Sequence, residues 1–461
     1  MRKQTKIAAV VSAAALLALG ASITSFAAAK GTWMMVDGEW YCYDKNGDVY
    51  ENTFCSSNGK EYYVGDDGML VRSSWVEYDG DYYFVNSSGA KIVNDWRLTT
   101  PYEDEDADEE WFYFQSTGKR ADNKKILYKG STFFFDADGK MLTGWVAEFD
   151  NKTADKDDDY YIEIDGETES YAVNNENIAD VYYCLYDEDK ADGHVQKNKW
   201  IKTWRPEDAY DEDEDEDKFW YWVEKDGKVY IPEKADADAY KYALGDGSLE
   251  IKNEGKQFGI AKKKINSKDY FFNMAGEMVN NFIDVVKTGD DDVIDLGMHY
   301  FGGSDDGSMK TGSQSIKDDN GDTYKFYFGT KDSGNEKKGV GITGNKNNKL
   351  YYEGHLVVAQ DYKYQTVDFI IGENKKESTF IVNQNGSIQH SAVEYKEDGD
   401  VLINAKAAKY NTTTGANKYS VEDVTKLIVN VEEIDETSVM AISGTFNASE
   451  SVVPSSSGAG K

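Results

Sequence analysis

The chain has 461 residues, a formal net charge of −34 and an aromatic content of 14%. A field of this sign repels phosphate groups, which excludes nucleic acids and anionic membranes as partners. The length would allow two or three ordinary domains, unless an internal repeat organises the chain differently.

The amino end has the pattern of a secretory signal peptide. Three basic residues precede an apolar run over 7–19, and the small residues 27–29 follow. We expect cleavage near Ala29, removal of residues 1–29 and export of the remainder. The alternative, a membrane anchor, needs an apolar span of about 20 residues, and this run is shorter. No other segment is apolar enough to cross a bilayer, so we expect no membrane insertion after cleavage.

Beyond this peptide, four landmarks recur with a period of 21 residues. They are an opening aromatic (Trp33, Phe54, Trp75, Trp96), a turn glycine (Gly38, Gly59, Gly80), a tyrosine (Tyr41, Tyr62, Tyr83) and a second glycine (Gly47, Gly68, Gly89). A period of about 20 residues indicates a stacked array rather than one globular core.

Each repeat has the pattern of a β-hairpin. A short strand, an Asp-Gly or Asn-Gly turn, an aromatic strand and a second glycine-containing turn follow one another. A lone hairpin is marginal in water, so each repeat must pack its aromatic residues against the next. Their first role is therefore that of a core.

The segment Trp33 to Gly47 contains Trp-x4-Gly-x-Trp-Tyr followed by a second glycine, and residues 133–145 end in Gly144-Trp145. Both resemble the cell-wall-binding repeat of the choline-binding type, found on Gram-positive surface proteins. The resemblance implies an all-β solenoid of stacked, aromatic-rich hairpins. It also implies that a ligand lies where the opening Trp of one repeat meets the Trp-Tyr of its neighbour.

Aromatic faces stack on sugar rings and attract quaternary ammonium groups. Carried over residue by residue, the resemblance predicts ligand contacts at Trp33, Trp40, Tyr41, Tyr62, Trp75, Tyr82, Tyr83, Trp96, Trp111, Trp145 and Trp220. The Trp that precedes the Tyr is replaced at Glu61, Thr132, Asp269 and Thr379. We therefore expect binding in only a few of the grooves between repeats.

After Trp96 the regular period breaks, and we divide the chain accordingly. Residues 30–145 are regular repeats, 146–389 are diverged repeats with acidic insertions, and 390–461 form a small β-rich cap with a flexible tail. The β-branched segment 421–431 favours a strand within that cap.

Acidic runs occupy 103–110, 155–159, 211–217 and 290–292. Each is expected to lengthen the turn between an opening aromatic and its aromatic strand. Solvation is one role for such loops, and weak binding of divalent cations, which favour clustered carboxylates, is the sharper alternative. No other cofactor is expected.

No catalytic constellation is evident, because the four histidines are scattered and carboxylates are too numerous to be diagnostic. The leading hypothesis is a non-catalytic secreted protein, associated with the cell wall or surface, that binds wall or related polysaccharide. Its charge requires that this polymer present neutral sugars or cationic groups, such as choline, or be bridged by metal ions. The alternatives are a structural spacer or assembly surface with no small ligand and, less favoured, a wall hydrolase.

The three cysteines allow two states. Cys42 and Cys55 can pair between neighbouring hairpins and leave Cys184 free, or all three can remain reduced and partly buried.

Overall fold

A computed structural model describes residues 28–104, 106–149, 160–164, 178–186, 192–206, 218–233, 240–243, 257–288, 293–333, 336–360, 362–371, 376–406 and 424–430. These residues form 31 β-strands, and no helix occurs among them, which confirms the predicted all-β class. The described part accordingly has no helix long and apolar enough to cross a membrane. The predicted signal peptide lies almost wholly outside the described residues.

The chain divides into two compact units, each considered by itself. Unit 1 is Met1–Asp122 with Asp138–Met141, and unit 2 is Asn123–Ala137 with Leu142–Lys461. The strands of unit 1 are β1 (Ala29–Lys30), β2 (Thr32–Val36), β3 (Glu39–Tyr43), β4 (Thr53–Ser57), β5 (Lys60–Val64), β6 (Ser74–Tyr78), β7 (Asp81–Val85), β8 (Asp95–Thr99) and β9 (Glu110–Phe114).

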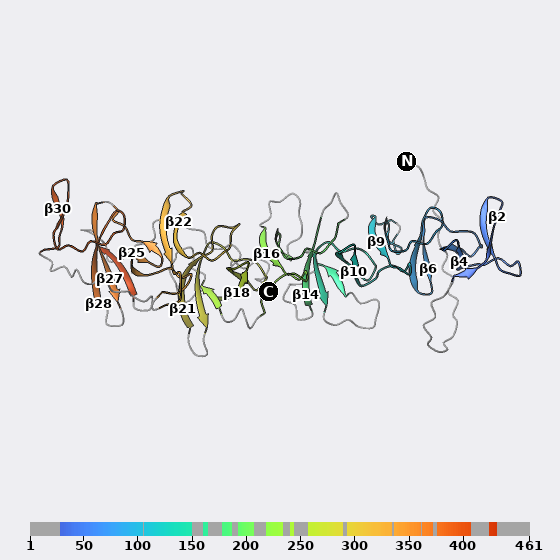
Figure 1. The fold of residues 1–461 in the computed structure, drawn as a ribbon, viewed down its shortest axis with the longest axis horizontal. Helices are drawn as coiled ribbons and strands as arrows, with labels where there is room; N and C mark the ends of the chain where they lie inside the picture. The colour runs from blue at the N-terminus through green and yellow to red at the C-terminus, as the bar shows by residue number, and fades with distance from the viewer. Residues whose placement is uncertain are drawn as a thin grey trace. The chain divides into compact units, whose positions relative to one another are not determined.

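Unit 1 consists of consecutive antiparallel hairpins, as the repeat predicted. The pairs are β2–β3, β4–β5, β6–β7 and β8–β9, and the two-residue β1 adds to β4 in parallel. Within this unit the labelled strands β2, β4, β6 and β9 follow one another in chain order (Figure 1). Each opening aromatic lies on the first strand of its hairpin.

The first turn of the first three hairpins is set by two consecutive residues with positive φ. Asp37 and Gly38 have φ of 52° and 92°, and Asn58–Gly59 and Asp79–Gly80 repeat the pattern. Such a pair is the signature of a type I′ turn, whose twist matches that of the flanking strands, and Asn-Gly and Asp-Gly tolerate it best. These dipeptides therefore fix the hairpin register.

A residue two places after each second-turn glycine joins its hairpin to the preceding one, and we call its place the return position. The backbone N–H of Leu70, at this position, donates to the carbonyl of Trp40 at 2.9 Å, while Val71 N–H donates to Tyr63 O in its own hairpin. The next second-turn glycine then covers the side chain: a Cβ on Gly89 would lie 2.7 Å from Leu70 Cδ1. Glycine is required there for its φ of 81° and for this close approach.

Unit 2 begins with the same hairpin and then forms larger sheets. Its strands are β10 (Lys124–Tyr128), β11 (Ser131–Phe135), β12 (Gly144–Phe149), β13 (Tyr161–Glu163), β14 (Ile178–Cys184), β15 (Lys199–Thr203), β16 (Phe219–Val223), β17 (Tyr240–Ala243), β18 (Gln257–Ile265), β19 (Lys268–Asn273), β20 (Phe282–Thr288), β21 (Val293–Tyr300), β22 (Gly312–Lys317), β23 (Thr323–Phe328), β24 (Gly344–Lys346), β25 (Lys349–Tyr352), β26 (His355–Leu356), β27 (Tyr364–Ile371), β28 (Lys376–Asn383), β29 (Glu394–Glu397), β30 (Asp400–Asn404) and β31 (Val424–Asn430).

Three sheets in unit 2 join strands that are distant in sequence. Two five-stranded sheets have the orders β19-β18-β17-β20-β21 and β22-β23-β26-β25-β24, and β31 pairs with β27 to give β28-β27-β31. The strand predicted within 421–431 is thus confirmed, and it extends an existing hairpin. The larger sheets were not predicted, because a hairpin is encoded by its turn whereas these pairings depend on distant contacts.

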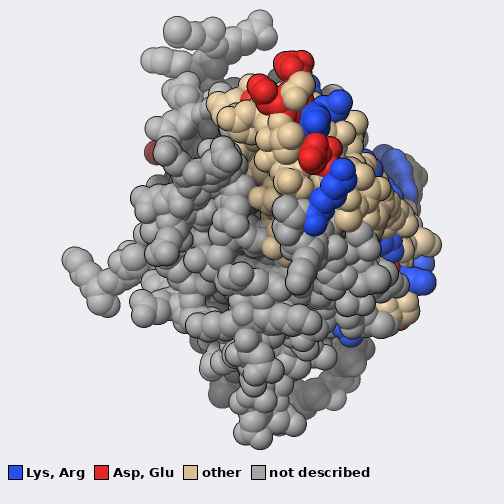
Figure 2. Space-filling model, turned by 90° about the vertical axis from the view of Figure 1, so that its left-hand side faces the viewer, with Lys and Arg blue, Asp and Glu red and all other residues tan. Residues whose placement is uncertain are grey.

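The acidic runs occupy the predicted place in the hairpins. Residues 103–110 connect β8 to β9 and reach the start of β9, 211–217 connect β15 to β16, and 290–292 connect β20 to β21. Run 155–159 likewise follows β12, before its partners β13 and β14. Runs 155–159, 211–217 and 290–292 lie outside the described residues. Where side chains are described on the face shown in Figure 2, acidic and basic groups lie beside one another.

All three cysteines are buried free thiols. Cys42 on β3 and Cys55 on β4 share a hydrogen bond, and burial raises the pKa of both thiols. Burial likewise raises the pKa of Cys184. Of the two states that the sequence allows, the structure has the reduced one.

Because two histidines are buried, we expect the folded protein to lose stability in acid. Burial lowers the pKa of His299 and of His355 from 6.5 to about 4. Between these values the unfolded chain binds more protons than the folded one, so stability falls as the pH falls from 6.5 to 4, by about 1.4 kcal/mol per pH unit for each histidine.

The substitution His355→Leu removes one of these two titrating imidazole groups. Its melting temperature should fall less steeply than that of the wild type between pH 6.5 and 4, in a differential scanning calorimetry series. An equal slope in both proteins would contradict the assignment.

Candidate ligand-binding groove

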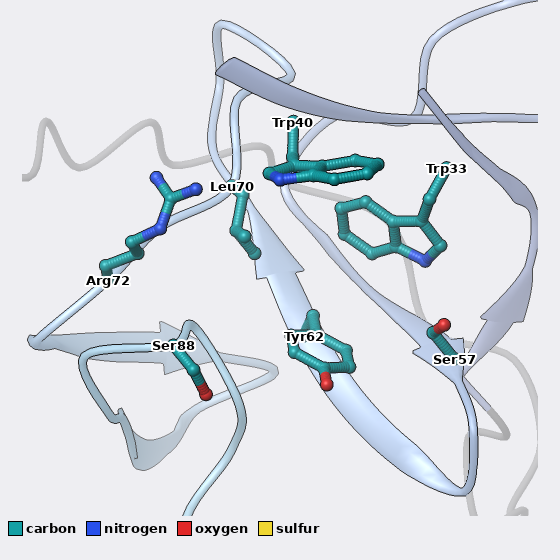
Figure 3. A pocket seen from close by; sticks show the side chains of 7 residues that line it. All are labelled: Trp33, Trp40, Ser57, Tyr62, Leu70, Arg72 and Ser88. Atoms are coloured by element: carbon teal, nitrogen blue, oxygen red, sulfur yellow. The ribbon is translucent and has the colours of Figure 1, made fainter. Parts of the chain in front are cut away.

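The first three hairpins of unit 1 line a groove of about 270 Å³. Its lining residues are Trp33, Trp40, Ser57, Tyr62, Leu70, Arg72 and Ser88. The rings of Trp33, Trp40 and Tyr62 border a common space in Figure 3, and Leu70 lies between Trp40 and Tyr62. The groove thus combines three residues that the sequence predicted as a ligand site.

The repeat explains how these rings meet. Trp33 and Trp40 lie on β2 and β3 of one hairpin, and Tyr62 lies on β5 of the next. The ring centroids of Trp33 and Tyr62 are 5.7 Å apart with an interplanar angle of 68°, an edge-to-face arrangement. Since the backbone of Leu70 is hydrogen-bonded to that of Trp40, the two hairpins hold the walls in place.

Polar groups line the edge of the groove. Arg72 is exposed, and one of its guanidinium nitrogens lies 3.1 Å from the carboxylate of Glu39. Ser57 and Ser88 add hydroxyl groups. The local charge of Arg72 is therefore balanced, and the edge can hydrogen-bond the polar part of a ligand.

The corresponding place one repeat later is occupied by the chain itself. Lys91 Nζ lies 4.8 Å from the ring centroid of Phe54 and 5.3 Å from that of Tyr83, and it forms an ion pair with Glu61. Glu61 stands where the first repeat has Trp40. Burial, as the largest cause, raises the pKa of Tyr83 to about 12, so this hydroxyl stays neutral at ordinary pH.

The third place is occupied as well. The guanidinium carbon of Arg120 lies 4.4 Å from the ring centroid of Tyr82 and 5.8 Å from that of Trp75. The ring of Tyr102, from the β8–β9 connection, lies 4.8 Å from that of Tyr82. The indole N–H of Trp75 donates to Thr100 O at 2.9 Å. Trp75 and Tyr82 thus face a cation that belongs to the protein.

The remaining predicted residues lie elsewhere. The ring centroids of Trp96 and Trp111 lie 6.4 Å apart across β8–β9 in an edge-to-face arrangement. The ring centroid of half-buried Tyr41 lies 6.5 Å from that of Tyr43. In unit 2, Trp220 donates to Asp305 at 3.0 Å beneath Lys202.

Trp145, by contrast, is 1% exposed and donates to Trp204 O at 3.0 Å, so it lies within the core of unit 2.

Two of the residues that replace the Trp before the Tyr make polar contacts of their own. Asp269 pairs with Lys338 at 2.7 Å, Thr132 accepts a hydrogen bond from Lys197 at 2.8 Å, and Thr379 is exposed. Among the described residues, no group of three or more His, Cys, Asp or Glu side chains is placed to hold a metal ion.

Several residues of these grooves were missed in the sequence, including Ser57, Arg72 and Ser88 at the edge of the first groove. Leu70, Lys91 and Arg120 share the return position, and their signal is their constant place two residues after a second-turn glycine. Tyr102 carries no such signal, because it lies in an inserted loop outside the repeat pattern.

The chain is similar in structure to choline-binding proteins of Streptococcus pneumoniae. Choline binding protein F matches 78% of this chain and 98% of its own, at 15% identity and a TM-score of 0.26. The choline binding domain of Spr1274 matches 19% of this chain and 90% of its own, at 25% identity and a TM-score of 0.15.

The modular autolysin LytC of the same organism matches 73% of this chain, at 17% identity and a TM-score of 0.37. The chain spans about half, 54%, of the length of that autolysin. No protein-family model and no curated protein sequence matches.

Proposed function

We propose that this chain is a non-catalytic, secreted surface protein that binds cell-wall or related polysaccharide through cationic decorations of the polymer. The groove of Trp33, Trp40 and Tyr62 receives a quaternary ammonium group such as that of choline. The observation that carries this proposal is the meeting of three aromatic walls around a space of about 270 Å³.

The chemistry of the walls favours a cation. The face of an aromatic ring is electron-rich, and each ring contact with a cation contributes about 0.5 to 2 kcal/mol. A quaternary ammonium group also presents methyl groups that pack against the indoles. The volume lies just below the range of about 300 to 1,000 Å³ typical of drug-sized ligands. It therefore suits a small head group.

The rest of the polymer would lie over the edge of the groove. Arg72 and the hydroxyls of Ser57 and Ser88 offer donors to sugar or phosphate oxygens next to the cation. A single groove of this size binds weakly, so attachment to a wall would depend on many decorations near one another.

The chemistry of the histidines supports a non-catalytic role. His299 and His355 are buried with lowered pKa values, and His299 Nδ1 donates a hydrogen bond to Gly297 O at 2.8 Å. His194 contacts Asp192, and exposed His390 contacts Asn348. Each of the four histidines therefore has surroundings of its own, and these contacts do not bring two histidines together.

A spacer role remains a second candidate for much of the array. The burial of Trp145 and the internal cations Lys91 and Arg120 favour it, because these aromatic residues serve the fold. A chain with an open groove in unit 1 would combine both roles.

Sedimentation with isolated Gram-positive cell walls tests the proposal. The full chain should sediment with choline-decorated walls and be released by free choline, while a neutral glucan at equal concentration should not release it. Walls without choline are the matched control. Absence of co-sedimentation, or release by the glucan alone, would contradict a cation-binding groove.

A further inference from the structure

We propose that Lys91 and Arg120 are built-in ligands of the second and third aromatic grooves, and that each groove becomes a binding site for a free organic cation when its own cation is removed. This inference rests on the proposed function of the first groove. It sets the number of free sites among these three grooves at one.

The three grooves are equivalent by backbone geometry. The N–H groups of Leu70, Lys91 and Arg120 donate to the carbonyls of Trp40, Glu61 and Tyr82, at 2.9, 2.8 and 2.8 Å. The next glycine covers each side chain in the same way: a Cβ on Gly118 would lie 2.8 Å from Lys91 Cδ, and one on Gly139 2.6 Å from Arg120 Cδ. The three side chains therefore start from one place in the repeat.

This place is otherwise apolar in the described repeats. The return position holds Leu70, Met141, Val195, Val229, Met278, Met309, Gly341 and Ile388. In the first groove the neutral side chain of Leu70 lines the space that the three rings border. Lys91 and Arg120 are the exceptions, and their long cationic side chains extend from the same position to the aromatic rings.

The surroundings of both cations are those of a bound ligand. Lys91 has a side chain only 10% exposed, between the rings of Phe54 and Tyr83, with Glu61 as its counter-ion. Arg120 is 4% exposed and lies over Tyr82, with carboxylate oxygens of Asp122 at 2.6 Å and Glu103 at 3.3 Å. In each groove, aromatic faces and carboxylates neutralise a desolvated positive charge.

Removing the cation leaves a complementary space. Lys91→Ala leaves Glu61 as an unpaired carboxylate beside two aromatic rings, which attracts an external cation of similar size. Lys91→Met keeps the bulk of the side chain without the charge, so the groove stays filled. Both variants lose the ion pair with Glu61, but only Lys91→Ala leaves an empty space in the groove.

Equilibrium dialysis of the full chain with labelled choline chloride tests this difference. Lys91→Ala should bind one more choline per chain than the wild type, whereas Lys91→Met and the exposed-surface control Lys60→Ala should bind the same number as the wild type. If the wild type binds choline but a folded Lys91→Ala gains no site, the inference is overturned while the proposed function stands. Additional binding by Lys91→Ala when the wild type binds none would leave the inference intact and reject the first groove.

Stability provides a second readout where Lys91→Ala folds poorly. Choline should then raise its melting temperature by more than it raises that of Lys91→Met, and equal shifts would overturn the inference. Arg120→Ala extends the test with methylguanidinium, which should stabilise this variant in preference to Arg120→Met.

Discussion

Trp40→Ala is expected to weaken choline binding at the first groove by about 2- to 30-fold. This range corresponds to the loss of one aromatic contact with a cation, about 0.5 to 2 kcal/mol. Trp40 is half-buried at the groove, so the fold should survive the change. Trp33→Ala combined with Trp40→Ala removes two of three walls and should abolish binding at this groove, as measured by calorimetry with choline.

Two variants serve as controls for this experiment. Trp40→Phe retains an aromatic face and should retain part of the affinity. Met34→Ala changes a side chain that is 45% exposed on the same strand as Trp33 but on the opposite face, and it should bind as the wild type does. Full binding by a folded Trp33→Ala/Trp40→Ala chain would remove these residues from the site.

Trp145→Ala is expected to destabilise unit 2 by about 3 to 5 kcal/mol, the usual cost of removing a buried Trp side chain. The Trp145 ring lies 4.8 Å from that of Tyr221 and 5.3 Å from that of Tyr183, and its loss would leave a cavity among them. It would also leave the carbonyl of Trp204 without its indole donor.

Hydrogen exchange read by mass spectrometry measures this effect locally. Amide protection should fall around β12, β14 and β16 in Trp145→Ala, while choline binding at the first groove should remain unchanged. Unaltered protection together with weaker binding would show that Trp145 is a groove wall.

The hairpins could be predicted because their determinants are local. Asp37-Gly38 and its equivalents specify the turn, and the 21-residue period places each opening aromatic on a first strand. The resemblance to choline-binding repeats then indicated which rings meet between hairpins. Trp33 and Tyr62 do meet in this way, and Trp40, from the same hairpin as Trp33, lines the same groove.

The use of each aromatic residue could not be predicted in the same way. Trp33 and Trp145 both open a hairpin, yet one borders a groove and the other is enclosed by Tyr183 and Tyr221. The difference depends on what the neighbouring hairpin places against the ring. For Trp75 the neighbour is Arg120, at a position whose side chain decides whether the groove is open or filled.

A crystal structure of the full chain grown with choline tests the central claim most directly. The trimethylammonium group should lie among the rings of Trp33, Trp40 and Tyr62, within about 6 Å of their centroids. The grooves that hold Lys91 and Arg120 should contain no choline. Choline bound elsewhere with the first groove empty, or no bound choline at saturating concentration, would contradict the account.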